Sequence, residues 1–182
     1  MFENGFSAVE HPLDAIRHEK LRRLYAYWEN ERQPQRWLAY ERLRPENFAY
    51  ALADVALLER GGTGDEFDLH VRLAGETIRH EALGFVRGKT SADFRPSWFR
   101  AHMVESCSAA FARAAPVCEA VTLHYGGDAF VYERLLLPLV RRGTEPDHLL
   151  MGAVLPQPLI DLKAAVKDCL SCEIKEPARR GP

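Results

Sequence analysis

Tyr132 and Arg134 stand two positions apart in a run of apolar residues, so both side chains project from one face of a predicted strand. A guanidinium and a phenol beneath an apolar lid would suit a small anionic or amphipathic ligand. Arg72, two positions after His70 in an alternating segment, is a third candidate, although it could instead pair with Glu133 across strands. These residue types predict binding chemistry.

A helix predicted from Pro96 to about Ala115 supplies the remaining pocket candidates. Phe99 and Met103 lie on its apolar stripe, and Trp98 and His102 flank that stripe. If this helix packs on the sheet, the four side chains face the strand that carries the tyrosine and the arginine. The alternative for Phe99 and Met103 is plain core packing, and for His102 a position at the surface or the pocket edge.

Two further motifs invite a chemical interpretation that their spacing does not support. Gly88-Lys89-Thr90 resembles the end of a phosphate-binding loop, but Leu83 occupies the position of the first glycine. Cys169 and Cys172 form a C-x-x-C pair, which offers two of the four ligands that zinc usually takes. Incidental thiols are the simpler interpretation, and we predict no metal site.

Catalytic residues are not apparent in the sequence. There is no Gly-x-Ser-x-Gly elbow, and the carboxylates are scattered. His124 and Asp128 are close together on a predicted strand and turn, a weak basis for acid–base catalysis. We therefore predict that the chain is not an enzyme.

Composition sets the broad class. The chain has 182 residues, of which 47% are hydrophobic and 27% are charged, as in an ordinary globular domain. A formal net charge of −2 argues against a dedicated nucleic-acid binder. No apolar run is long enough for a membrane span, and the N-terminus lacks a signal-peptide pattern, so we expect a cytoplasmic protein with its cysteines as thiols.

The elements that position these residues can be read from hydrophobic periodicity and turns. We predict a loose segment over 1–12, helices over 14–32, 76–83, 96–115 and 158–170, and strands over 54–59, 67–73, 117–125, 129–140 and 148–155. Because the strands cluster instead of alternating with helices, we predict an α+β fold with a five-stranded antiparallel sheet. Helices follow the second strand, and further helices flank the sheet at both ends of the chain.

The strand over 130–140 is apolar on both faces, which predicts that both faces of the sheet are covered. The central helices would cover one face, and the N-terminal helix or a partner chain the other. We divide the chain into an N-terminal lead-in with helices (1–50), a core domain (51–156) and a C-terminal helix and tail (157–182).

The N-terminal helix carries apolar side chains on more than one face. Leu21, Leu24, Tyr25 and Trp28 offer more apolar surface than one packing interface requires. We therefore predict a homodimer with these four residues in its interface.

Over residues 21–155 the chain resembles the PAS superfamily, and in particular a stand-alone PAS group common in alphaproteobacteria. The matching segments are Leu24-Tyr25-Ala26-Tyr27-Trp28, Arg72-Leu73-Ala74-Gly75, Gly88-Lys89 and the segment from Tyr132 to Leu139. The chain departs from the pattern of this group in the short helical region. Members of the group usually have an aromatic-glycine pair there, whereas this chain has Leu83-Gly84, about one residue away from that position.

The resemblance implies a five-stranded antiparallel sheet curved around a small pocket, with a helix across its concave face. Members of the superfamily bind small ligands or cofactors and signal through flanking helices, often as dimers. The resemblance also implies that His102 could ligate haem iron. Flavin photochemistry requires a cysteine on a short helix, and the segment from Glu76 to Thr90 contains no cysteine. The cofactor, if any, is unknown.

We therefore predict a PAS-type sensory or adaptor domain that binds an unidentified small molecule, a signalling protein, or both. Two alternatives remain open: a small α+β enzyme with its site in a cavity, and a structural interaction domain without a ligand.

Overall fold

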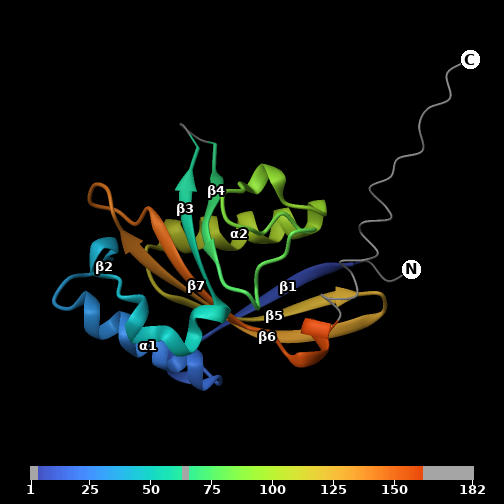
Figure 1. Cartoon of the computed structure of the whole chain (residues 1–182), viewed down its shortest axis with the longest axis horizontal. Coiled ribbons are helices and arrows are strands. Elements are labelled where there is room, and N and C mark those ends of the chain that lie inside the picture. The colour runs from blue at the N-terminus through green and yellow to red at the C-terminus, as the bar shows by residue number, and fades with distance from the viewer. Residues whose placement is uncertain (1–3, 63–65, 162–182) are drawn as a thin grey trace, which may run out of the picture.

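The computed structural model describes residues 4–62 and 66–161. Within these residues the chain forms one antiparallel sheet, with β2 added in parallel, and helices on both of its faces (Figure 1). The sheet has seven strands: β1 (Gly5–His11), β2 (Leu38–Ala39), β3 (Val55–Gly61), β4 (Asp68–Ala74), β5 (Val117–Tyr125), β6 (Asp128–Val140) and β7 (His148–Val154). Their order is β1-β5-β6-β7-β3-β4, and β2 pairs with the end of β6. The predicted α+β class is confirmed.

Two antiparallel hairpins of the sheet have glycines at their turns. β3 and β4 pair antiparallel across the first turn. In the second, Gly126 and Gly127 have positive φ angles of 61° and 95°, and Tyr125 pairs with Asp128. Two positive φ values are what the tightest hairpin turns require, and glycine adopts them without steric cost.

Alternation along β6 divides the core into two layers. Leu135, Leu137 and Leu139 face α1 (Glu19–Arg32), while Leu136 packs in the core that α2 (Ser97–Arg113) covers. The 3₁₀ segment η3 (Pro45–Asp54) joins α1 on the first face. Both faces are thus covered within one chain, as the two-sided apolar pattern predicted.

α1 lies close against β7 because the sheet provides space for it. Leu21, Leu24 and Trp28 are buried, and the indole of Trp28 donates a hydrogen bond to the carbonyl of Pro138 at 2.9 Å. A Cβ atom at Gly152 would lie 2.8 and 2.9 Å from the two leucine side chains. The absent side chain of Gly152 therefore sets the distance between helix and sheet.

The first helix begins later than predicted. It starts at Glu19, after a 3₁₀ turn at η1 (Leu13–Ala15). The carboxylate of Glu133 accepts hydrogen bonds from the backbone N–H groups of Arg17 (2.9 Å) and His18 (2.8 Å). These bonds hold the segment before the helix against the sheet in an extended conformation.

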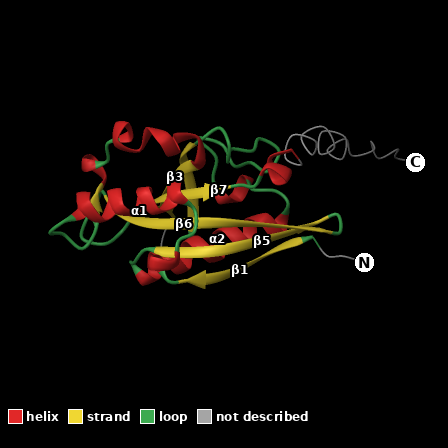
Figure 2. Cartoon of the chain, turned by 90° about the horizontal axis from the view of Figure 1, so that it is seen from below, coloured by secondary structure: helices red, strands yellow, loops and turns green. Residues whose placement is uncertain are grey.

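The segment over 1–12 was predicted to be loose, and for residues 5–11 this was wrong. These residues form β1, which pairs antiparallel with β5 from Gly5 opposite His124 to His11 opposite Cys118 (Figure 2). Most side chains of β1 are exposed, so the strand has almost no hydrophobic pattern. β1 and the two-residue β2 account for the difference between the five predicted and the seven observed strands.

The predicted helix over 76–83 was also wrong. This segment folds as a series of turns, anchored where the N–H of Thr77 donates to the carbonyl of Ala53, and His80 pairs with Phe85 in an isolated bridge. A short 3₁₀ turn, η4 (Ser91–Asp93), follows. The described chain ends in a helix that begins at residue 157, and the rest of the predicted helix, with its C-x-x-C pair, lies outside the described residues.

None of the described helices combines the length and the apolar character that crossing a membrane requires.

Candidate functional site

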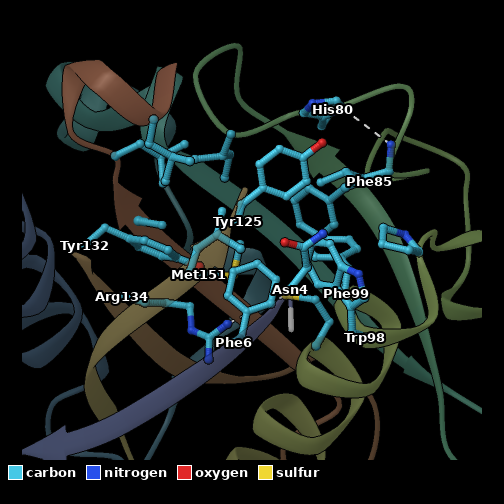
Figure 3. A pocket seen from close by; sticks show the side chains of 18 residues that line it. Asn4, Phe6, His80, Phe85, Trp98, Phe99, Tyr125, Tyr132, Arg134 and Met151 are labelled. Carbon is cyan, nitrogen blue, oxygen red and sulfur yellow. Dashed lines mark hydrogen bonds between the residues drawn. The ribbon is translucent and has the colours of Figure 1, made fainter. Parts of the chain in front are cut away.

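A cavity of about 320 Å³ lies between α2 and the sheet. Its walls come from β1, the turns before α2, α2 itself, the three strands β5, β6 and β7, and the segment after β7. The lining residues are Asn4, Phe6, Ile78, His80, Leu83, Phe85, Pro96, Trp98, Phe99, Met103, Leu123, Tyr125, Tyr132, Arg134, Met151, Ala153, Leu155 and Leu159. Tyr132 and Arg134 lie on the opposite side of the pocket from Trp98 and Phe99 (Figure 3).

Aromatic rings make up much of this wall. The ring centroid of Phe6 lies 5.3 Å from that of Trp98 and 6.0 Å from that of Phe99. Phe85 meets Phe99 edge-on at 6.1 Å. Such tilted and edge-on contacts are favourable for aromatic pairs, and they leave ring faces for a further ring to contact.

Arg134 is 1% exposed, and its charge is balanced inside the protein. Its Nε and Nη2 atoms donate to one carboxylate oxygen of Glu119 at 3.0 and 2.5 Å, and Nη2 also donates to the hydroxyl of Ser106 at 2.7 Å. Nη1 donates to His102 Nε2 at 3.0 Å and faces the sulfur of Met103 at 3.7 Å. Because each of the five donors has a partner, the guanidinium is satisfied without a ligand.

His102 supports this arrangement from behind. Its ring stacks on Phe6 at 4.4 Å, and its Nε2 accepts the hydrogen bond from Arg134. Burial and the neighbouring guanidinium charge lower the pKa of His102 to about 3. The imidazole is therefore neutral at physiological pH and acts as an acceptor.

Several polar groups of the wall have no hydrogen-bond partner among residues 4–62 and 66–161. They include the hydroxyls of Tyr132 and Tyr125 and the indole N–H of Trp98. Burial raises the pKa of Tyr132, although the nearby charge of Arg134 opposes the shift. The phenol therefore stays protonated, and it can donate a hydrogen bond to a group in the cavity.

Five of the seven predicted pocket residues line the cavity: Trp98, Phe99, Met103, Tyr132 and Arg134. The other two lie elsewhere. His102 is behind the wall, in contact with Arg134, and Arg72 is on β4, outside the lining.

The pairing of Arg72 with Glu133, considered as an alternative to a pocket role, does not occur. Arg72 Nε donates to Glu59 on the paired strand β3, while Glu133 faces α1 and its preceding segment. Arg142 approaches the other oxygen of Glu59 at 3.2 Å. Burial raises the pKa of Glu59, but the hydrogen bond and charge of Arg72 and the other nearby cations outweigh it and lower the pKa overall.

The sequence interpretation missed the parts of the pocket that come from β1 and from the turns before α2. Asn4 and Phe6 reach the cavity because β1 pairs with β5, and Phe85 reaches it through the bridge to His80. The one available signal was Phe6, a large apolar side chain within a polar segment.

The Gly88-Lys89-Thr90 segment has a structural role. The Gly88 N–H donates to the carbonyl of Val71, Lys89 pairs with Asp93 at 3.4 Å, and the Thr90 hydroxyl caps η4. The backbone around Gly88 thus makes loop contacts within the protein and does not form the cradle of a phosphate-binding loop.

The histidine and carboxylate considered for catalysis, His124 and Asp128, are both exposed at the β5–β6 hairpin. They do not face the cavity that the lining residues enclose.

The helix residues predicted for a dimer interface are mostly used inside the chain. Leu21, Leu24 and Trp28 are at most 1% exposed and pack on the sheet. Tyr25 is half-buried, and its hydroxyl donates to Glu29 at 3.0 Å. In this conformation the first three side chains present no surface to a second chain.

Comparison with known proteins agrees with this architecture. A family model described as PAS domain matches residues 16–155, which include α1 and the strands β2 to β7. Neither the curated proteins nor the solved structures gave a significant match. The matched region covers most of the chain, including α1, α2 and every strand except β1, and the chain belongs to the PAS domain family.

Proposed function

We propose that this PAS domain is a sensory or adaptor module whose cavity binds a small, uncharged, largely aromatic ligand. PAS domains serve in general as sensory, signalling or interaction domains, and the family match supports that role. The observation that carries the ligand class is the aromatic cavity whose buried arginine is already paired with Glu119.

The size of the cavity supports a compound of about two fused rings. A dry apolar cavity of about 150 Å³ is known to take up benzene in another protein. The cavity here, about 320 Å³, is roughly twice as large. The hydroxyl of Tyr132 and the indole N–H of Trp98 supply hydrogen-bond donors, which would orient one polar group of such a compound.

The charge balance favours a neutral ligand over the anionic one considered from the sequence. A carboxylate that enters beside Arg134 would have to compete with Glu119, which accepts two hydrogen bonds from the guanidinium. An additional buried anion without a free cation is costly. A hydroxyl or carbonyl group carries no such cost.

The residues present do not fit haem ligated through His102. The Nε2 atom that would bind iron accepts a hydrogen bond from Arg134, and a guanidinium 3.0 Å away opposes a metal cation there.

Two probes that share the naphthalene ring test the proposal. We expect 2-naphthol, which is neutral, to bind at least about tenfold more tightly than 2-naphthoate, which is anionic, because only the second buries a charge. Isothermal titration calorimetry on the purified chain gives both affinities. Native mass spectrometry of the freshly purified protein would detect a ligand that is carried through purification.

A matched pair of variants locates the binding. Ala153, 3% exposed and directly opposite Arg134 on β7, lines the cavity, so Ala153→Phe should fill it and abolish binding. Ala129→Phe adds the same ring at an exposed position of β6 and should leave binding unchanged. Tighter binding of the naphthoate would contradict the charge argument, and no binding of either probe would favour an adaptor without a ligand.

The adaptor role and the homodimer are supported only by general properties of PAS domains. Sedimentation analysis at high concentration tests the dimer, and a strict monomer would contradict it. The cytoplasmic location stays a prediction.

A further inference from the structure

His11, Cys118 and Glu133 form a cluster on the α1 face of the sheet, opposite the pocket. They come from three neighbouring strands: His11 on β1 is the direct partner of Cys118 on β5, and Glu133 lies diagonally on β6. One atom of each side chain, a ring nitrogen, the thiol sulfur and a carboxylate oxygen, lies within 4.8 Å of the other two. The sheet therefore holds three metal-binding groups in a fixed register.

Two of the three separations already match those of a tetrahedral zinc centre. His11 Nε2 lies 3.5 Å from Cys118 Sγ and 3.2 Å from Glu133 Oε1. With usual zinc bond lengths and tetrahedral angles, a nitrogen and a sulfur ligand lie about 3.6 Å apart, and a nitrogen and an oxygen ligand about 3.4 Å apart.

The imidazole of His11 is oriented as in metal sites. Its Nδ1 lies 3.3 Å from the carbonyl oxygen of Pro12, so this nitrogen carries the proton in the neutral ring. A metal-bound histidine typically donates its second N–H in this way. The Nε2 lone pair then faces Glu133, also an acceptor, at 3.2 Å, and two facing acceptors need a proton or a cation between them.

Glu133 is held in place by groups that leave it able to bind a cation. Its Oε1 accepts from the N–H of Arg17 and its Oε2 from that of His18, so each oxygen keeps a lone pair. A hollow of about 400 Å³ borders His11 and Glu133. It has room for a water molecule at the fourth position, which three-ligand zinc sites keep open.

We propose that His11 Nε2, Cys118 Sγ and Glu133 Oε1 bind one divalent transition-metal ion, Zn²⁺ in the first place, with water as the fourth ligand. The mixed nitrogen, sulfur and oxygen set suits Zn²⁺ and not Mg²⁺ or Ca²⁺, which take oxygen ligands. On binding, the S–H bond of Cys118 breaks, the sulfur binds the metal and the proton passes to solvent. The ion ties β1 to β5 and β6.

Titration of the full chain, purified without a histidine tag, with Co²⁺ tests the site. Co²⁺ has the same ligand geometry as Zn²⁺, and a bound thiolate gives a charge-transfer absorption in the near ultraviolet. We expect this band in the wild type and its loss on addition of Zn²⁺. Cys118→Ser should abolish the band.

A second variant is needed because Cys118 is buried, and Cys118→Ser could lose the band through a folding defect. His11 lies on an edge strand, so His11→Ala should fold, as far-ultraviolet circular dichroism would show, and should weaken Co²⁺ binding at least about 100-fold, since even an outer-shell partner is worth about 10–100-fold. Cys107→Ser, at a buried thiol on α2, is the matched control and should keep the band.

The Cys169→Ser/Cys172→Ser double variant separates this site from the C-x-x-C pair, and it should also keep the band. The proposal is overturned if the wild type shows no charge-transfer band. In that case a proton, and not a metal ion, lies between His11 and Glu133. It is equally overturned by a band that survives in Cys118→Ser, by a Co²⁺ affinity of His11→Ala that falls by less than the expected factor of about 100, or by loss of the band in the double variant.

Discussion

His102 is buried as a neutral imidazole, and this should make the protein lose stability in mild acid. Burial and the charge of Arg134 lower the pKa of His102 to about 3 in the folded chain, against 6.5 for an ordinary histidine. Between these two values the unfolded chain binds a proton that the folded chain does not bind. The free energy of unfolding therefore falls as the pH drops below 6.5, and the loss is complete only near pH 3.

The two pKa values give the size of the effect. From about pH 7 to about pH 4.5 the loss from this residue is about 2.5 kcal/mol, an appreciable part of the typical 5–15 kcal/mol stability of a domain. Removal of the titrating group should abolish this loss. His102→Gln does so and keeps an amide oxygen that can accept the hydrogen bond from Arg134 Nη1.

Urea denaturation followed by circular dichroism at the two pH values measures the effect. The stability of His102→Gln should change less between the two pH values than that of the wild type, by about 2 kcal/mol. His124→Gln is the matched control, because His124 is exposed on β5, and it should behave like the wild type. An equal loss in the wild type and in His102→Gln would show that His102 takes up its proton in the folded chain and would refute the reasoning.

Two further substitutions test the packing that shapes the pocket and the opposite face of the sheet. Glu119→Gln removes the charge that balances the buried Arg134, so the free energy of unfolding should fall by about 3–5 kcal/mol, and a loss below about 1 kcal/mol in urea denaturation would contradict a charged buried pair. Gly152→Ala brings a Cβ within 2.9 Å of two leucine side chains of α1, so thermal unfolding should report a loss of about 1–3 kcal/mol, while Gly5→Ala, with no neighbouring atom within 4 Å, should cost far less. Equal effects of the two glycine substitutions would refute the close approach of helix and sheet.

The elements with strong periodicity could be predicted from the sequence. The strand 117–125 was predicted with the bounds that β5 has, and the predicted helix 96–115 differs from α2 by one or two residues at its ends. Both have buried and exposed sides that alternate with the period of their backbone, which is the signal that such prediction uses. β1 lacks this signal because most of its side chains face water, and only its pairing with β5 makes it a strand.

The partner of Arg134 could also have been predicted. A two-residue turn at Gly126 and Gly127 places Tyr125 opposite Asp128, and counting back along both strands places Glu119 opposite Arg134. The register of a hairpin is local information, carried by the turn. The pairing of β1 with β5 joins segments more than a hundred residues apart, and no turn fixes it, so the contact of His11 with Cys118 could not be foreseen.

The pocket candidates also divide into those that local sequence patterns could predict and those that they could not. Tyr132, Arg134 and the helix residues follow from strand parity and helical spacing. Arg72 was misplaced because parity alone does not say which face of a strand points to the cavity. Its neighbour across the hairpin, Glu59, holds it on the opposite side from the pocket lining.

β1 lies outside the region that the family model matches, yet it places Asn4 and Phe6 in the wall of the pocket. A ligand that contacts these two side chains binds better to chains in which β1 is docked on β5. By linkage, such a ligand at about 100 times its dissociation constant would favour the docked state by up to about 2.7 kcal/mol.

The edge of β5 is paired when β1 is docked and bears free backbone N–H and C=O groups when it is not. A ligand that stabilises the docked β1 would therefore reduce the exposure of this strand edge. An edge of this kind can be read by any protein that adds a strand to it.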